Sequence, residues 1–249
     1  MTAPQLVSCI MPTHNRRRFV PRAIAYFLRQ DHPRKELVII DDGTESVEDL
    51  VPPLPSIRYH RADRADGRMM LGEARNLACE LASGSVIAHW DDDDWQAPDR
   101  LSRQVRQLES GWADLCGMTS LLYYDPVGDR TWRFTWPPRL HPWLAGQSLC
   151  YRRELWEDSP FPALPNGEDS VFVRRAANRS DRSVARTTPG DSVVALVHPG
   201  NTVAKTSRGV FCVPAAMTEI HALLGPDADF YRTLRTGDPA PYAIDNMTT

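Results

Sequence analysis

The most chemically distinctive stretch of the sequence is a run of four aspartates, Asp91, Asp92, Asp93 and Asp94, which follows an apolar segment and lies between two tryptophans. Adjacent carboxylates repel one another, so they need either full solvation or a neutralising cation. Mg²⁺ and Mn²⁺ prefer oxygen ligands and often bridge one or two carboxylates to phosphate groups. The run therefore indicates a metal–phosphate site. The alternative is a solvated helix start, in which Asp94 or Asp99 caps the following helix.

Polar residues also follow two other apolar runs. Pro12, Thr13 and Asn15 follow the first run, and the adjacent acids Asp41 and Asp42 follow the second. Polar loops are ordinary in an α/β protein, but they do not explain the acids that follow two of the three apolar runs. One of these runs is followed by two adjacent aspartates and another by four. A further acidic pair, Glu168-Asp169, follows Asn166-Gly167, and helix capping alone is the simpler explanation for it.

Hydrophobic patterning predicts the elements that position these side chains. Apolar runs predict strands, and apolar residues at helical spacing predict helices between them. The expected strands cover residues 6–11, 36–40, 57–60 and 86–90, and the expected helices cover residues 20–28, 72–82 and 98–108. This alternation predicts a mostly parallel sheet with helices on its faces, which binds its ligand at the carboxyl ends of the strands.

After residue 111 the pattern changes. Residues 113–124 predict one or two strands, and further short strands are expected at 147–151 and 193–197. Helices are expected from Glu168 onward and at 214–224. Proline clusters at 51–55, 136–142 and 160–165 mark loops.

Composition excludes several classes of protein. The chain has 249 residues and a net charge of −3, so it has no basic field for nucleic acid. Five cysteines without CxxC spacing indicate reduced thiols and a cytoplasmic protein. No signal peptide is expected, and no run of 18 apolar residues predicts a transmembrane helix.

Five motifs occur in order along residues 5–200. They are Ile10-Met11-Pro12-Thr13-His14-Asn15-Arg16, Val38-Ile39-Ile40-Asp41-Asp42-Gly43, Gly72-Glu73-Ala74-Arg75-Asn76, Asp91-Asp92-Asp93-Asp94 with Pro98, and Asn166-Gly167-Glu168-Asp169. The ordered set resembles the inverting nucleotide-sugar glycosyltransferases of family 2. The resemblance implies the GT-A fold, a Rossmann-like, mostly parallel sheet with helices on both faces and a small mixed subregion. It also implies a nucleotide-sugar-binding half over 1–110, an acceptor and catalytic half over 111–225, and a loose tail over 226–249.

The resemblance implies roles for the residues of the first half. Pro12, Thr13 and Asn15 would line the nucleotide pocket, and Asp41 would accept a hydrogen bond from the base, with Asp42 nearby. Such an acceptor suits uracil, thymine or guanine, so UDP- or dTDP-sugars are the expected donors and GDP-sugars the second choice. Arg75 would lie along the ribose or the diphosphate, although a surface helix arginine is the alternative.

For the acidic run, the resemblance implies a metal site for Mn²⁺ or Mg²⁺. Asp91 and Asp93 match the family's Asp-x-Asp motif, with Asp93 as the best direct ligand. Asp92 and Asp94 would contact the nucleotide sugar, Asp94 through its sugar or through a metal-bound water. His198 could be a third ligand, although a single histidine is often structural.

Asp169 would be the general base, with Glu168 beside it. Inversion needs one carboxylate to take the acceptor hydroxyl proton and a separate cation to offset charge on the leaving group. The sequence supplies two separated acidic sites for these two tasks.

Several other residues keep two interpretations. Lys205 or Arg208 could meet phosphate, and Trp132, Trp136 and Trp143 could form an acceptor platform or pack in an irregular segment. His14 and His89 are the weaker site candidates. At the position of His89 the family usually has an apolar or aromatic residue, so we interpret this histidine as packing or as support behind the site.

The expected partners are a nucleotide-sugar donor and a hydroxyl acceptor such as a glycan, a lipid-linked sugar, a natural product or a peptide. A processive polysaccharide synthase is not expected, since the sequence has no Gln-x-x-Arg-Trp motif and no transmembrane segment. Two alternatives remain. A sugar-phosphate pyrophosphorylase or other nucleotidyltransferase would need a glycine-rich loop after the first strand, which the sequence lacks. A degenerate, nucleotide-binding homologue would not need intact Asp91, Asp93 and Asp169.

Overall fold

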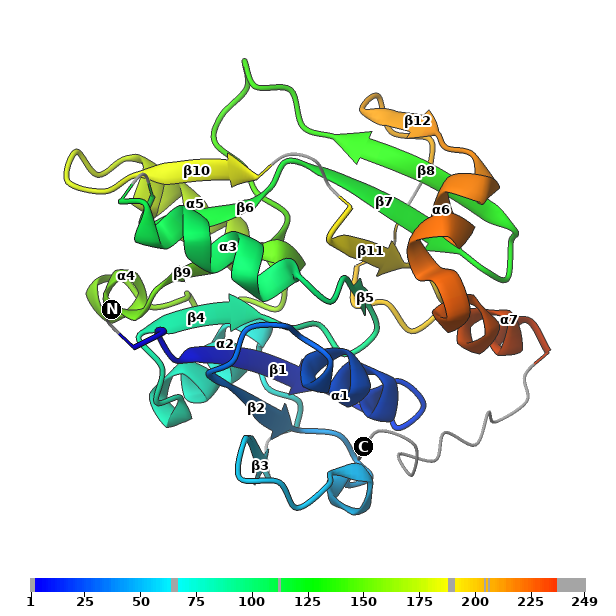
Figure 1. The fold of residues 1–249 in the computed structure, drawn as a ribbon, viewed down its shortest axis with the longest axis horizontal. Helices are drawn as coiled ribbons and strands as arrows, with labels where there is room; N and C mark the ends of the chain where they lie inside the picture. Colours follow the sequence, from blue (N-terminus) through cyan, green and yellow to red (C-terminus); the bar gives the residue numbers. More distant parts are fainter. Residues whose placement is uncertain are drawn as a thin grey trace.

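The first and larger sheet positions the acidic run. The computed structural model describes residues 3–63, 67–111, 113–187, 191–203, 205 and 207–236. The strands of this sheet are β1 (Val7–Thr13), β2 (Lys35–Asp41), β3 (Ile57–Arg61), β4 (Val86–His89), β6 (Leu115–Met118), β9 (Cys150–Arg152) and β10 (Val184–Thr187). Their order in the sheet is β10-β6-β9-β4-β1-β2-β3 (Figure 1).

Most neighbours in this sheet are parallel. β1 pairs in parallel with both β2 and β4, and β2 pairs in parallel with β3. β9 is antiparallel to both β4 and β6. The expectation of a mostly parallel sheet is confirmed, and the carboxyl ends of β1, β2 and β4 meet at one edge, where ligands bind in such sheets.

Helices cover both faces of the sheet. On one face, α1 (Val20–Leu28) and α3 (Arg100–Glu109) share a core with alternate residues of β1 such as Cys9. On the other face, α2 (Leu71–Leu81), α4 (Arg153–Asp158) and α5 (Glu168–Ala177) pack with Ile10 and its neighbours. Successive residues of one strand thus enter two cores, which explains why these strands are continuous apolar runs.

A second sheet forms the mixed subregion expected after residue 111. Its strands are β5 (Trp95–Gln96), β7 (Ser120–Asp125), β8 (Arg130–Thr135), β11 (Val193–Leu196) and β12 (Cys212–Pro214). They follow the order β12-β8-β7-β11-β5, with β11 parallel to β7 and the other pairs antiparallel. β7, β8 and β12 lie at the upper right of Figure 1, together with α6 (Met217–Leu224).

The expectation of a loose tail from residue 226 is wrong for residues 228–236. They form α7 (Ala228–Thr236), whose Phe230 and Tyr231 are buried in the core shared with α1. The Tyr231 hydroxyl lies 2.9 Å from that of Tyr26. Two aromatic rings bury enough apolar surface to fix a short helix. Residues 237–249 of the expected tail lie outside the described residues.

Other local differences are smaller. The strand expected at 147–151 is a 3-10 turn, η2 (Gly146–Ser148), followed by β9, and α3 begins at Arg100, two residues after Pro98.

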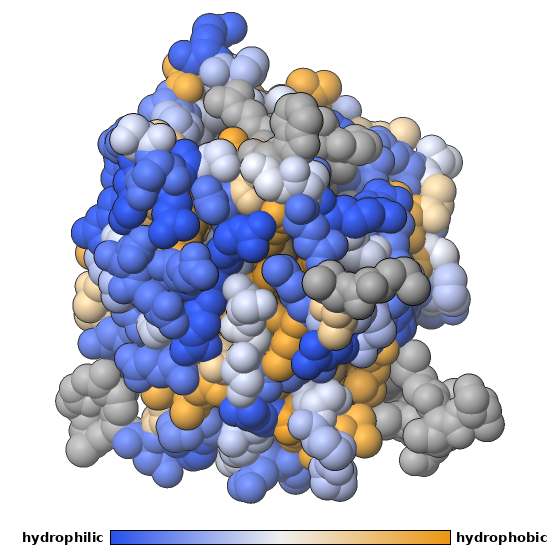
Figure 2. Space-filling view, turned by 60° about the vertical axis from the view of Figure 1, so that its left-hand side comes forward, coloured by the Kyte–Doolittle hydropathy of each residue, from blue (hydrophilic) through white to orange (hydrophobic). Residues whose placement is uncertain are grey.

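Cys9, Cys79, Cys116 and Cys150 are buried thiols. In the described parts of the chain, every helix is too short or too polar to cross a membrane. The face shown in Figure 2 is mainly hydrophilic.

Candidate active site

A cleft opens where β1, β2 and β4 end, and α5 closes its far side. Among the residues predicted for the site, most line this cleft. They are Pro12, Thr13, Asp42, Arg75, Asp91, Asp92, Asp93, Asp94, Glu168 and Asp169. Residues from positions 12 to 169 therefore meet in one place, as the motif order implied.

Three of the four aspartates form a group suited to a cation. Single carboxylate oxygens of Asp91, Asp93 and Asp94 all lie within 4.8 Å of one another. Burial raises the pKa of Asp91, which Arg75 partly opposes. Burial and the charges of Asp93 and Asp91 raise the pKa of Asp94 well above its ordinary value. Such crowded acids fit a hard divalent cation, because its charge offsets both the burial and the repulsion.

The fourth aspartate, Asp92, has a different role in the geometry. Its Oδ2 accepts a 2.6 Å hydrogen bond from the Thr13 hydroxyl, and its Oδ1 lies 3.0 Å from Arg16 Nη1. Burial raises the pKa of Asp92 to about 7, although the charge of Arg16 opposes this shift. Asp92 thus ties the end of β1 to the end of β4.

Arg16 and His198 converge on Asp93. The same Arg16 nitrogen also pairs with Asp93 Oδ2, and His198 Nε2 lies 3.0 Å from this oxygen. Burial alone would raise the pKa of Asp93, but the hydrogen bonds and charges of His198 and Arg16 lower it overall. His198 is therefore within reach of a cation held by Asp93. Asn201 Nδ2 is a further donor to that oxygen, at 3.2 Å.

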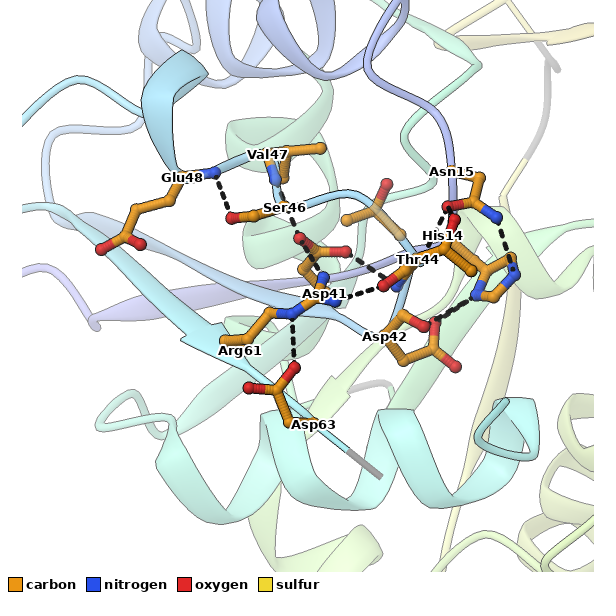
Figure 3. A network of polar contacts seen from close by, with 12 residues as sticks. His14, Asn15, Asp41, Asp42, Thr44, Ser46, Val47, Glu48, Arg61 and Asp63 are labelled. Carbon is orange, nitrogen blue, oxygen red and sulfur yellow. Dashed lines mark hydrogen bonds and ion pairs between the residues drawn. The ribbon is translucent and has the colours of Figure 1, made fainter. Parts of the chain in front are cut away.

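The two adjacent acids at the end of β2 point in different directions (Figure 3). Asp41 is fully buried, accepts hydrogen bonds from the backbone of Gly43 and Val47, and is not among the residues that line the cleft. Tyr59 and Arg61 also contact its Oδ2, at 2.8 and 2.9 Å. Asp42 lines the cleft, with Oδ1 3.0 Å from His14 Nδ1. The structure thus places Asp42, rather than Asp41, at the cleft surface.

The loop after β1 is fastened to the loop after β2. Asn15 Oδ1 accepts hydrogen bonds from the Thr44 backbone and hydroxyl, at 2.7 and 2.9 Å (Figure 3). Asn15 has a φ of 56°, a left-handed conformation that asparagine tolerates better than most residues. Asn15 was predicted to line the nucleotide pocket, but it is not among the residues that line the cleft; instead it shapes the loop that carries His14.

Arg75 is not the surface arginine of the alternative interpretation. It is buried, its Nη1 pairs with Glu168 Oε1, and its Nη2 lies 3.7 Å from Asp91 Oδ1. It therefore connects the acidic run to the acidic pair of α5. Glu168 is 1% exposed, and its Oε2 has no hydrogen-bond partner among the described residues. This carboxylate oxygen in the cleft wall therefore lacks the hydrogen bond that a buried polar group needs.

Asp169 stands at the amino end of α5. Gly167 caps this helix with a φ of 77°, which a residue with a side chain rarely adopts. Asp169 Oδ1 accepts a 2.6 Å hydrogen bond from the Ser170 backbone N–H. Its Oδ2 lies against Gly146, where an added Cβ would be 1.8 Å away.

His89 is fully buried behind the cleft. Its Nδ1 lies 2.7 Å from the Gly146 carbonyl oxygen, and its Nε2 lies 3.4 Å from the Tyr151 hydroxyl. Burial and the charge of Arg75 lower the pKa of His89 well below its ordinary value. The expectation of a supporting residue fits this place.

Several polar residues that line the cleft had no predicted role of their own, namely Arg16, Arg68, Gln147, Asn166, Asn201 and Thr202. Arg16 is the last residue of the first motif, which was the available signal. Arg68 comes from a loop without a distinctive pattern, and Gln147 lies in η2, where the sequence predicted a strand. Of the predicted phosphate contacts, Lys205 lines the cleft, whereas Arg208 is exposed and outside its lining.

The three tryptophans of the possible acceptor platform separate into two environments. Trp132 is 3% exposed and stacks on Tyr123 at a centroid distance of 5.5 Å. Trp136 and Trp143 are half-buried, and their rings are 5.6 Å apart. Only these two offer accessible ring surface.

Comparison with known proteins identifies the class to which this fold and cleft belong. The sequence profile described as Glycosyl transferase family 2 matches residues 8–164, and the chain belongs to this family. It is 42% identical over 102 residues to WcaA of Escherichia coli (strain K12), which is named as a colanic acid biosynthesis glycosyl transferase. The match covers 39% of this chain and 36% of WcaA. EpsJ of Bacillus subtilis (strain 168), an uncharacterized glycosyltransferase, is 30% identical over 208 residues, covering 71% of this chain and 57% of EpsJ.

Solved structures show the same fold. TarS of S. aureus, in a complex with UDP-GlcNAc, matches with a TM-score of 0.62 and 20% identity over 79% of this chain and 60% of that one. The mannosyltransferase PcManGT of Pyrobaculum calidifontis, in a complex with GDP-Man and Mn²⁺, matches with a TM-score of 0.60 and 21% identity, covering 84% and 59%. The fold is therefore GT-A. In each of these four comparisons the match spans less than two thirds of the other protein.

Proposed function

We propose that this chain is a metal-dependent inverting glycosyltransferase that moves a sugar from a nucleotide diphosphate to a hydroxyl acceptor. The observation that carries the proposal is the arrangement of two acidic sites in one cleft. The group formed by Asp91, Asp93 and Asp94 is crowded and suited to a cation, whereas Asp169 stands apart on α5. Family membership supports this interpretation.

The cation would be Mn²⁺ or Mg²⁺, held by Asp91 and Asp93, with Asp94 and His198 within reach. When bound, it would offset the charge that develops on the departing diphosphate. Arg16, Arg68 and Lys205 bring further positive charge to the same cleft for phosphate.

The nucleotide would bind at the ends of β1 and β2. We assign the contact with the base to Asp42, which lines the cleft, and we assign to Asp41 the task of holding the loop 43–47 in place. Pro12 and Thr13 line the same part of the cleft, and Asn15 supports the rim. UDP- and dTDP-sugars remain the favoured donors and GDP-sugars the second choice, because a carboxylate can accept from all three bases.

The base would be Asp169. In a single displacement, the acceptor oxygen bonds to the anomeric carbon, the bond from that carbon to the diphosphate oxygen breaks, and Asp169 takes the hydroxyl proton. The free Oε2 of Glu168 would accept from a hydroxyl of donor or acceptor and orient it. Arg75 pairs with Glu168 and approaches Asp91, so it would link the two sites.

The acceptor side is defined only by chemistry. The acceptor must present a hydroxyl near Asp169, and the half-buried rings of Trp136 and Trp143 are candidates for stacking against it. A glycan, a lipid-linked sugar, a natural product and a peptide all meet this requirement. A cytoplasmic location remains a proposal, supported by the buried thiols.

A panel of UDP-glucose, UDP-GlcNAc, dTDP-glucose and GDP-mannose with Mn²⁺ tests the proposal. The transferase predicts slow release of free sugar and nucleoside diphosphate from at least one donor, with water as acceptor. Release of pyrophosphate from nucleoside triphosphate and sugar phosphate would instead identify a pyrophosphorylase. Tight binding without turnover, even with a range of hydroxyl acceptors, would identify a degenerate homologue.

A further inference from the structure

The position of the proposed base depends on a backbone segment, not only on its own helix. Asp169 Oδ2 lies so close to Gly146 that a Cβ there would be 1.8 Å from it. The Gly146 backbone is thus the surface against which this carboxylate rests. Any shift of η2 would change where the Oδ2 atom lies.

Buried polar side chains hold η2 from behind. His89 Nδ1 lies 2.7 Å from the Gly146 carbonyl oxygen, and since a carbonyl only accepts, this nitrogen carries the proton. Arg100 Nη2 donates to the carbonyls of His89 and Gln147, at 2.9 and 3.0 Å. Gln104 Nε2 donates to the Ser148 carbonyl at 2.7 Å. Each carbonyl of η2 therefore has a buried donor.

We propose that His89 is a positioning residue for the glycosyl-transfer step, acting through the Gly146 carbonyl on the carboxylate of Asp169. This inference rests on the proposed function, because it takes Asp169 as the base. His89 is the donor of the three that reaches the residue in contact with Asp169. It is fully buried, so it acts on the substrate only through this backbone.

His89 also joins the two acidic sites mechanically. It is the last residue of β4, and the acidic run begins two residues later. Its backbone N–H donates to the Leu149 carbonyl at 2.9 Å, which fixes β4 to the segment after η2. His89 thus contacts this region twice, through its side chain at the Gly146 carbonyl and through its backbone at the Leu149 carbonyl.

Three single variants separate this role from simple packing. His89→Leu keeps a buried apolar volume but removes the donor to Gly146. His89→Asn places an amide N–H near the position of Nδ1, so it should restore the donor. Tyr151→Phe is the matched control, because it removes the hydroxyl near Nε2 and leaves Nδ1 unchanged.

Turnover of the fastest donor in the panel and its calorimetric affinity are measured for each variant. We expect His89→Leu to lower kcat by about 10–100-fold with unchanged donor affinity, since small misplacements of reacting groups cost this much. His89→Asn and Tyr151→Phe should stay within about threefold of the wild type. In an Asp169→Asn background, His89→Leu should add less than about threefold, because residues that act as one unit are not additive.

Several results would overturn the inference. They are a folded His89→Leu variant with wild-type kcat, a full additional loss in the Asp169→Asn background, or a loss of donor affinity. If Asp169→Asn itself turns over normally, the proposed base fails and the inference with it.

If the wild type turns over none of the four donors, a crystal structure of His89→Leu decides the mechanical claim. A displaced Gly146 supports it, and an unmoved Gly146 with unmoved Asp169 contradicts it. If His89→Leu does not fold, His89→Asn decides: wild-type kcat supports the inference, and a loss as large as about 10-fold contradicts it.

Discussion

The two acidic sites of the cleft contain the same kind of side chain in opposite settings. Asp91, Asp93 and Asp94 are crowded together, and burial raises the pKa of Asp91 and Asp94. Asp169 lies in the first turn of α5, half-buried and outside that crowded group. In our proposal, the first setting holds the cation and the second supplies the proton acceptor. The surroundings of a carboxylate, rather than its residue type, therefore decide which role it can take.

The largest expected effect is the loss of the cation site. Asp93→Ala should lower turnover by about 10³-fold or more, because a metal supplies several kcal/mol of charge stabilisation to the leaving group. Turnover and donor binding are titrated with Mn²⁺ and repeated in EDTA. Asp99→Ala is the matched control, since this half-exposed aspartate pairs with Arg103 on the surface of α3. Full activity of the wild type in excess EDTA would show that turnover does not need a metal.

The next effect concerns the link between the two sites. Arg75→Met leaves Glu168 as a buried carboxylate without its cation, so the free energy of unfolding should fall by about 3–5 kcal/mol. The double variant Arg75→Met/Glu168→Gln should recover part of this loss. Both are measured by denaturant unfolding. An unchanged free energy of unfolding for Arg75→Met would mean that the pair does not hold the sites together.

A smaller effect is expected from crowding the base alone. Gly146→Ala places a methyl group where Asp169 Oδ2 lies, so the carboxylate must move. We expect kcat to fall by about 10²-fold with donor affinity retained. Steady-state kinetics and calorimetry with the same donor measure both quantities. Wild-type kcat would show that the position of Oδ2 is not critical.

The smallest effect comes from the turn before α5. Gly167→Ala should lower the free energy of unfolding by about 1–2 kcal/mol, because its φ of 77° is costly for alanine although no atom crowds the position. Gly111→Ala is the matched control, with a φ of 74° and equally open space at the end of α3. Both should destabilise alike, and only Gly167→Ala should change kcat. If the two variants have the same kcat, the conformation of the turn before α5 does not affect the transfer step.

The sequence predicted β1, β2 and β4 well, because these strands are buried on both faces and form continuous apolar runs. It did not predict β10 at the edge of the same sheet. It did not predict which acid of the pair at the end of β2 faces the cleft. Consecutive residues of a strand point to opposite sides, and the sequence does not show which of the two acids points to the cleft. The contacts of Asp41 with Val47 and Tyr59 turn it away from the cleft and leave Asp42 facing it.

Long-range pairing explains the other misses. Arg16 approaches Asp92 and Asp93 across more than 70 residues of sequence, which no local pattern reveals. α7 is short, and its stability comes from burying Phe230 and Tyr231 against distant residues such as Tyr26. β8 mixes tryptophan with arginine next to a proline cluster, so its pattern indicated a loop.

The division of labour between the two acidic sites is tested most directly by Asp169→Asn, which keeps the shape of the side chain but cannot accept a proton. Removing a general base typically costs about 10²–10⁴-fold in rate. We expect kcat to fall by this factor while the calorimetric affinity for the donor with Mn²⁺ stays near the wild-type value. Wild-type kcat would place the base elsewhere, with Glu168 as the next candidate, and complete loss of donor binding would contradict the separation of the two sites.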